Sequence, residues 1–110
     1  MLPQPNRLRS SSDLRHVMRR GRRLGSTHLV LHVFTRPEPS APRAGFVVGK
    51  VVGNSVQRHR VIRQLRHVVA GRLGSIPEST DLVVRDLGGA HDADVAGELG
   101  HLLARAGLHA

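Results

Sequence analysis

The stretch "VVGKVVGNSVQRHRVIRQLRHVV" (residues 47–69) decides how this chain folds. Its first part is apolar and β-branched, and together with residues 44–46 it predicts a strand over residues 44–52. Gly53 is typical of a turn, and Asn54 with Gln57 three positions later predicts a helix N-cap of the capping-box kind. The stretch therefore predicts a strand, a turn and a helix over about residues 55–72.

The predicted helix has two unlike sides when residues are placed about 100° apart. One side is an apolar stripe made of Val61, Ile62, Leu65, Val68, Val69 and Leu73. The other side is basic and holds His59, Arg60, Arg63, Arg66 and His67, with Arg58 in the first turn. No acid stands between Lys50 and Glu78, so these charges gain no i,i+4 ion pairs. This pattern favours binding of a polyanion over an ordinary solvated helix face.

Length and composition limit the class of protein. A chain of 110 residues supports one domain, residues 1–110, with a modest core. The chain has no cysteine, which excludes disulfides and thiolate metal sites, and Phe34 and Phe46 are its only aromatic residues. It contains no apolar run of about 20 residues and no signal-peptide apolar region. We expect a soluble, intracellular protein of the cytoplasm.

The net charge of +9 is unevenly distributed. Residues 1–75 hold 15 of the 17 Lys and Arg against two acids, whereas residues 76–110 hold two arginines and six acids. Sixteen of the basic residues are arginine, whose planar guanidinium suits bidentate phosphate contacts. Nucleic acid is therefore the first candidate partner. A membrane surface is disfavoured, because the apolar residues opposite the charges are needed for the core.

The remaining elements follow from periodicity and turn residues. Residues 1–9 predict an extended basic arm, and a short amphipathic helix follows from the Ser run at residue 10 to Gly21. Residues 28–34 and 80–87 predict two more strands, and residues 36–43 a proline-rich loop. The last predicted helix is capped by Asp92 and buries Val95, Leu99, Leu102, Leu103 and Ala106. This order predicts an α+β sandwich, one sheet with helices packed on it.

No catalytic or metal site is predicted within the chain. His28 and His32 share an i,i+4 spacing, but on a strand they would lie about 13 Å apart, too far for one ion. Asp92 and Asp94 suit helix capping better than a catalytic pair. No Ser/His/Asp spacing indicates a nucleophile.

The segment "VVGKVVGNSVQRHRVIRQLR" (47–66) resembles the signature of the bacterial ribonuclease P protein family. That signature runs through a strand, a Lys, a Gly-Asn turn and a helix that opens with an Arg-Asn-Arg-like triplet. "NRLRSSSDLRHVMRRGRRLGSTHLVLHVF" (6–34) is similar to the N-terminal helix and strand of the family, and "DLVV" (81–84) to its last strand.

The resemblance implies the order αβββαβα, a four-stranded mixed sheet with a left-handed βαβ crossover, similar to domain IV of elongation factor G. The residues alone predict three strands, and the general rule for such crossovers predicts a right-handed one. The resemblance places the fourth strand around Arg23–Ser26.

The resemblance also implies the function. Family members are non-catalytic partners of a catalytic RNA, one protein for each RNA, and the complex removes the 5′ leader from precursor tRNA. The RNA carries the active-site Mg²⁺, so no cofactor is expected on the protein. The protein binds the RNA through its basic helix, and it holds the leader in a cleft between the sheet and the N-terminal helix. The alternative is a general basic RNA- or DNA-binding or ribosome-associated protein without a role in cleavage.

Carried over by position, the expected RNA-binding residues are Lys50, Asn54, Arg58, His59, Arg60, Arg63 and Arg66. Three positions depart from the family pattern: His59 where Asn is usual, Ile62 where a basic residue is usual, and Val51 where Lys is frequent. We expect a supporting contribution from the basic residues Arg7, Arg9, Arg19, Arg20, Arg22 and Arg23.

The expected leader-binding residues are Leu14, Met18, His32 and Phe46. The first three stand where relatives commonly carry aromatic residues, so Phe46 is the expected remaining ring for stacking on a base. For Leu14 and Met18 a place in the core is an equal alternative. Phe34 is assigned to the core.

Overall fold

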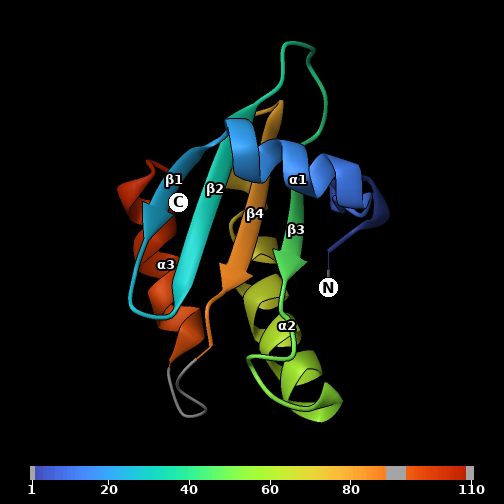
Figure 1. Ribbon diagram of the computed structural model, residues 1–110. Helices are drawn as coiled ribbons and strands as arrows, with labels where there is room; N and C mark the ends of the chain where they lie inside the picture. The colour runs from blue at the N-terminus through green and yellow to red at the C-terminus, as the bar shows by residue number, and fades with distance from the viewer. Residues whose placement is uncertain (1, 89–93, 109–110) are drawn as a thin grey trace.

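The computed structural model describes residues 2–88 and 94–108 (Figure 1). Its elements are α1 (Ser11–Arg20), β1 (Arg22–Gly25), β2 (Leu29–Thr35), β3 (Arg43–Val47), α2 (Ser55–Ala70), β4 (Thr80–Asp86) and α3 (Val95–Arg105). Two 3-10 turns, η1 (Gln4–Asn6) and η2 (Leu73–Ser75), complete the order. The α+β class is confirmed, and so is the fourth strand at the place that the resemblance gave it.

The four strands form one mixed sheet in the order β1-β2-β4-β3. β2 pairs antiparallel with β1 and with β4, whereas β3 pairs parallel with β4. The parallel pair is joined through α2. Viewed from the side of α2 with β3 and β4 pointing upward, β4 lies to the left of β3, so the crossover is left-handed (Figure 1). This confirms the implied topology against the usual right-handed rule.

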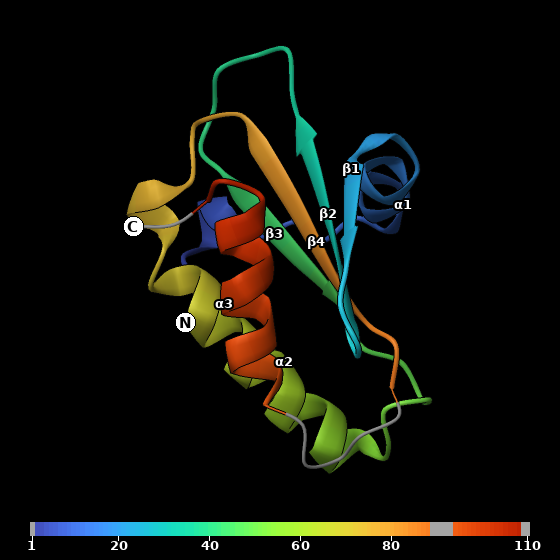
Figure 2. The same cartoon turned by 90° about the vertical axis from the view of Figure 1, so that its left-hand side faces the viewer.

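The helices cover the two faces of the sheet unequally. α1 crosses one face near one end of the strands, while α2 and α3 lie together on the other face (Figure 2). Residues of each strand alternate between these faces. In β4, Leu82 and Val84 belong to the core under α2 and α3, while Val83 between them belongs to a smaller cluster under α1.

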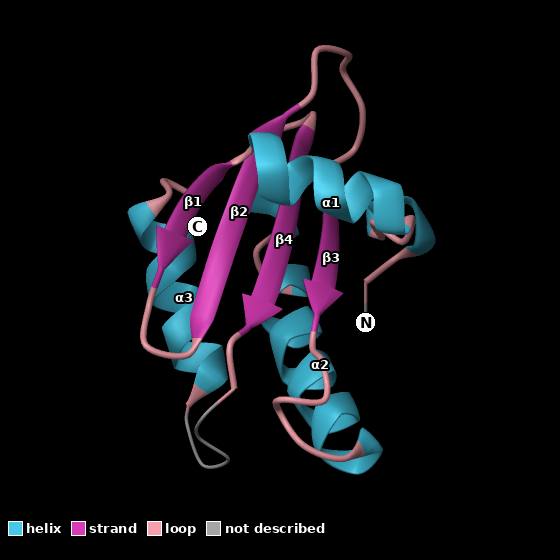
Figure 3. Cartoon of the chain, in the orientation of Figure 1, coloured by secondary structure: helices cyan, strands magenta, loops and turns pink. Residues whose placement is uncertain are grey.

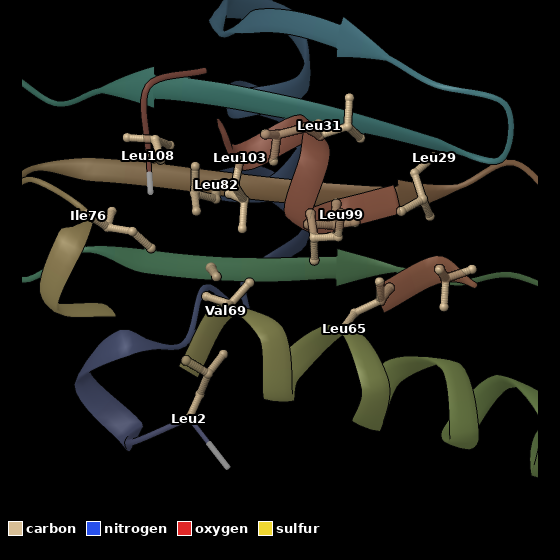
Figure 4. Packing of buried hydrophobic residues seen from close by; sticks show 14 residues of the cluster. Leu2, Leu29, Leu31, Leu65, Val69, Ile76, Leu82, Leu99, Leu103 and Leu108 are labelled. Carbon is tan, nitrogen blue, oxygen red and sulfur yellow. The ribbon is translucent and has the colours of Figure 1, made fainter. Parts of the chain in front are cut away.

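The main core lies between the sheet and the α2–α3 layer (Figure 4). Leu65 and Val69 of α2 are fully buried there against Leu99 and Leu103 of α3 and residues of β2 and β4. Burial of each such side chain contributes about 1.5–3 kcal/mol. The apolar stripe predicted for α2 is therefore its attachment to the domain.

β3 is shorter than the predicted strand over residues 44–52 (Figure 3). Its register with β4 ends with Val47 opposite Arg85, one residue before β4 itself ends at Asp86. Beyond that point the chain turns through Gly49 to Gly53, with Val51 68% exposed and Val52 buried. The apolar run thus supplies a strand and then a connection, which its composition does not distinguish.

The N-terminal segment is not a fully extended arm. Gln4–Asn6 form a 3-10 turn, Leu2 and Leu8 are buried, and the Leu8 N–H donates to the carbonyl oxygen of Ala44 at 2.9 Å. Arg7 forms a parallel bridge with Ala44, so this segment lies along the outer edge of β3.

The cap predicted for α2 is confirmed, whereas the cap predicted for α3 is wrong. α2 begins after Asn54, and the reciprocal bonds between Asn54 and Gln57 form the expected capping box. α2 ends at Ala70, two residues before the predicted end. α3 is capped by Asp94, whose side chain accepts from the Gly97 N–H, while Asp92 lies outside the described residues.

A buried carboxylate fixes the start of the parallel pair. Asp81 is 3% exposed and stands in register with Arg43, whose Nε and Nη2 donate to its two oxygens at 2.9 and 2.8 Å. Arg36, from the proline-rich segment 36–43, lies 3.0 Å from the same carboxylate. Ser79 binds the carbonyl oxygens of Glu38 and Ser40, so this loop is held at the end of the sheet.

We predict that Asp81→Asn lowers the free energy of unfolding by about 1–3 kcal/mol, because two partly buried guanidinium groups lose their charged acceptor. Urea unfolding measures this change. Glu38→Gln removes the same charge from an exposed side chain of the same loop and should change stability by less than about 0.5 kcal/mol. Equal stability of the two variants would contradict the role given to Asp81.

Candidate nucleic-acid interface

α2 presents its basic side to solvent, as the periodicity predicts. Leu65 and Val69 are fully buried, and Val61, Ile62 and Val68 are half-buried beside them. The exposed side chains on the other side are His59, Arg60, Arg63, Arg66 and His67. Arg58, in the first turn, is half-buried. We call Arg58, Arg60, Arg63 and Arg66 the basic ridge.

The start of α2 adds positive potential to this ridge. Unpaired backbone N–H groups at a helix N-terminus attract anions. Asn54 Oδ1 accepts from the Gln57 N–H at 2.9 Å, so the side-chain amide oxygen of Asn54 forms the cap. Lys50 is exposed in the preceding turn. Val51 and Val56 in the same region are 68% and 65% exposed.

Within the part of the chain that the structure describes, no carboxylate pairs with the arginines of the ridge. Ion pairs there join His28 to Glu98 and Arg36 and Arg43 to Asp81, and none includes a side chain of α2. Arginines held at a surface without carboxylate partners bind phosphate oxygens well, because no competing contact must be broken.

The six supporting arginines do not form one surface. Arg7 and Arg9 lie beside α2, since they and Arg66 line a common pocket. Arg19 and Arg20 are exposed at the far end of α1. Arg22 donates to the Ala106 carbonyl at the end of α3 at 3.0 Å, while Arg23 pairs with His32 on the α1 face of the sheet.

The pocket lies at the outer edge of β3, between the N-terminal segment and α2, and has a volume of about 360 Å³. Four small or aliphatic residues, Leu2, Leu8, Ala44 and Gly45, are buried at its base. Leu14, Phe46 and Ile62 are half-buried along its sides, and Arg7, Arg9 and Arg66 complete the lining. We call this the edge pocket.

The predicted leader-binding residues are divided between two places. Leu14 and Met18 are half-buried and pack on the cluster of Leu8, Val17 and Val83, so they are neither fully core nor free. His32 lies on the same face of the sheet. Phe46 packs instead with the main core on the opposite face, and it meets Leu14 only at the edge pocket.

Phe34 takes the place on the α1 face that Phe46 was expected to hold. It is half-buried, packs against the same cluster as Leu14 and Met18, and meets the His16 ring edge to face at 4.9 Å between centroids. The period of two in a strand could have shown this, because Phe34 follows His32 by two residues. The same rule puts Phe46 with Ala44, and Arg85 with Val83, so Arg85 is a basic residue of the α1 face that sequence reasoning missed.

His32 is buried and unpaired within the described structure. It is 3% exposed, and neither ring nitrogen has a hydrogen-bond partner there. Burial, with the positive charges of Arg85 and Arg23, lowers the pKa of His32 below its usual value of 6.5. The ring is therefore neutral at pH 7 and offers one acceptor and one donor nitrogen.

Two further observations concern the described residues only. They contain no group of three His, Cys, Asp or Glu side chains placed to hold a metal ion. Within the same ranges, no helix has the length and apolar character needed to cross a membrane.

Comparison with known proteins gives one consistent result. The family model described as Ribonuclease P matches residues 2–107. The ribonuclease P protein component of Rhodococcus opacus is 48% identical over 99 residues, which cover 84% of this chain and 79% of that protein. The Streptomyces bikiniensis protein of the same name is 49% identical over 104 residues, covering 87% and 85%. The solved Staphylococcus aureus RNase P protein has a TM-score of 0.86 at 22% identity, covering 96% and 98%.

We predict that the neutral state of His32 makes stability depend on pH. As the pH falls below 6.5, the unfolded chain binds a proton at His32 that the folded chain does not bind, so the free energy of unfolding decreases until the pH passes the lowered pKa. His32→Phe keeps a ring and removes this proton. Urea unfolding between pH 8 and pH 5 should show a steeper loss for the unchanged protein, and parallel curves would refute the assignment.

Proposed function

The chain belongs to the ribonuclease P protein family, and we propose that it acts as the RNA-binding, non-catalytic subunit of this tRNA-processing endonuclease. The basic ridge of α2 binds the ribonuclease P RNA through phosphate contacts. The catalytic Mg²⁺ ions belong to the RNA, and one protein serves each RNA in the cytoplasm. The chain contributes binding and positioning, not a reacting group.

The single observation that supports this proposal is the way α2 is mounted. Its apolar stripe is buried in the core, and four arginines stand on the remaining surface without a carboxylate partner among the described residues. Phosphate contacts of this kind position a protein on RNA and supply salt-dependent affinity. A rigid helix carries the contacts at a fixed spacing of about 1.5 Å per residue along its axis.

We propose the α1 face of the sheet as the surface for the precursor-tRNA leader. His32, Leu14 and Met18 lie on this face, with Phe34 as its ring and Arg23 and Arg85 as its charges. A single strand binds through backbone charge and stacking on aromatic side chains. Since Leu14 and Met18 cannot stack as rings do and His32 is only 3% exposed, leader binding depends on Phe34 and the arginines.

The decisive experiment is cleavage of precursor tRNA by the organism's own ribonuclease P RNA at low Mg²⁺, with and without the protein. We expect faster cleavage and tighter precursor binding when the protein is present, and no cleavage by the protein alone. Binding of the RNA without any change in cleavage would identify a general basic RNA-binding protein instead.

We predict that Arg63→Ala weakens binding to the ribonuclease P RNA and reduces the slope of log K against log salt by about 0.7–0.9, because one phosphate contact is lost. Filter binding at several salt concentrations measures both quantities. Arg60→Ala should behave alike, since both side chains are exposed on the ridge.

Arg105→Ala is the matched control, because it removes the same charge from an exposed position on α3. Its slope should equal that of the unchanged protein. A ridge variant with the control's slope would show that its arginine does not contact phosphate.

A further inference from the structure

We propose that the edge pocket binds one unpaired nucleotide of the ribonuclease P RNA, with the base against Phe46 and Ile62 and the phosphate at Arg9 and Arg66. This inference rests on the proposed function and adds a specific contact to it. It concerns the outer edge of β3, next to the surface proposed for the leader, and Leu14 lines both places.

The shape and lining of the pocket suit a nucleobase. Its volume of about 360 Å³ lies at the lower end of the range of small-ligand sites. Phe46 and Ile62 are half-buried there, so each keeps part of its apolar surface accessible to a ligand. A base that stacks on an aromatic ring buries both flat surfaces at small entropic cost, which is the usual way that proteins hold unpaired RNA bases.

The charges around the pocket suit the sugar-phosphate part of the same nucleotide. Arg9 and Arg66 are exposed, and Arg7 is held beside them because its Nε donates to the Leu2 carbonyl at 2.8 Å. None of the described residues that line the pocket is acidic. An apolar base site beside three guanidinium groups complements a nucleotide better than an apolar peptide side chain.

Gly45 lines the pocket at a point where the N-terminal segment and α1 approach β3 closely. A Cβ on this residue would collide with the Leu14 side chain and the Leu8 carbonyl oxygen. Gly45 therefore lets α1 and the N-terminal segment close over β3, and the remaining space opens toward α2.

The position favours the RNA subunit over the leader as the source of the nucleotide. Ile62 and Arg66 belong to α2, so an RNA strand bound along the basic ridge passes the pocket mouth directly. Of the residues proposed for the leader, Leu14 lines the pocket, whereas Met18, His32 and Phe34 do not, and Phe46 packs on the α2 face. A contact between Ile62 and the base would also explain why this position is apolar here, where the family usually has a basic residue.

The test compares the two phenylalanines of the chain. Phe46→Leu keeps an apolar side chain and removes the ring from the pocket, while Phe34→Leu makes the same change on the α1 face. We expect Phe46→Leu to bind the ribonuclease P RNA, without precursor tRNA, about 5-fold to 100-fold more weakly, with an unchanged salt slope. Phe34→Leu should bind this RNA as the unchanged protein does.

Arg9→Gln provides a second variant at an exposed position, where folding is not at risk. It should weaken binding to the RNA and reduce the salt slope by less than one, because it removes a phosphate contact and leaves the base site. Circular dichroism at the temperature of the binding assay confirms that each variant is folded.

Photocrosslinking identifies the source of the nucleotide. Phe46→p-azidophenylalanine in the reconstituted holoenzyme with precursor tRNA should crosslink to one unpaired nucleotide of the RNA subunit. Crosslinks confined to the leader, or equal RNA affinity of Phe46→Leu and the unchanged protein, would overturn the proposal. Such a result would leave the proposed function standing if the unchanged protein binds the RNA and stimulates its cleavage of precursor tRNA.

Discussion

The parallel pairing of β3 with β4 is the constraint on which the rest of the molecule depends. Two parallel neighbours require the chain to return from one end of the sheet to the other, and α2 makes that return. The buried carboxylate of Asp81 joins Arg43 at the first rung of this pair. Because α2 must bury Leu65 and Val69 on the way, its rotation about its own axis is determined. The basic ridge faces outward as a consequence of how α2 packs on the sheet.

The strict alternation of side chains in β4 then separates two surfaces. Val84 faces α2 and α3, while Val83 faces α1, and neighbouring strands follow the same rule. The helix proposed to bind RNA and the face proposed for the leader are therefore on opposite sides of one sheet, held at a fixed distance by its thickness. If the protein acts as proposed, this rigidity couples the two contacts, because neither surface can move independently of the other.

Much of this could be predicted from the sequence. The helix of residues 55–70 was predictable because its cap, its apolar stripe and its charges all give the same answer. β1 was not predictable from periodicity, since its four residues include two exposed arginines and it is defined by pairing with β2. The left-handed crossover came from the resemblance alone. The faces of the sheet on which Phe34 and Phe46 lie could have been predicted from strand alternation. The edge pocket could not, because residues far apart in sequence meet there only after the sheet forms.

The docking of the N-terminal segment also has a consequence for the order of folding. Leu2 is buried in the main core with Ala44 of β3 and Leu65 and Val69 of α2, while Leu8 is buried with Val17 and Val83 and its N–H donates to the Ala44 carbonyl oxygen. During synthesis, residues 2–8 leave the ribosome well before residues 44–69, which build their binding surface. The native contacts of Leu2 with α2 therefore form only after residues 65–69 have been synthesised. Until residues 2–8 dock, the outer edge of β3 is an unprotected strand edge that could pair with other strands.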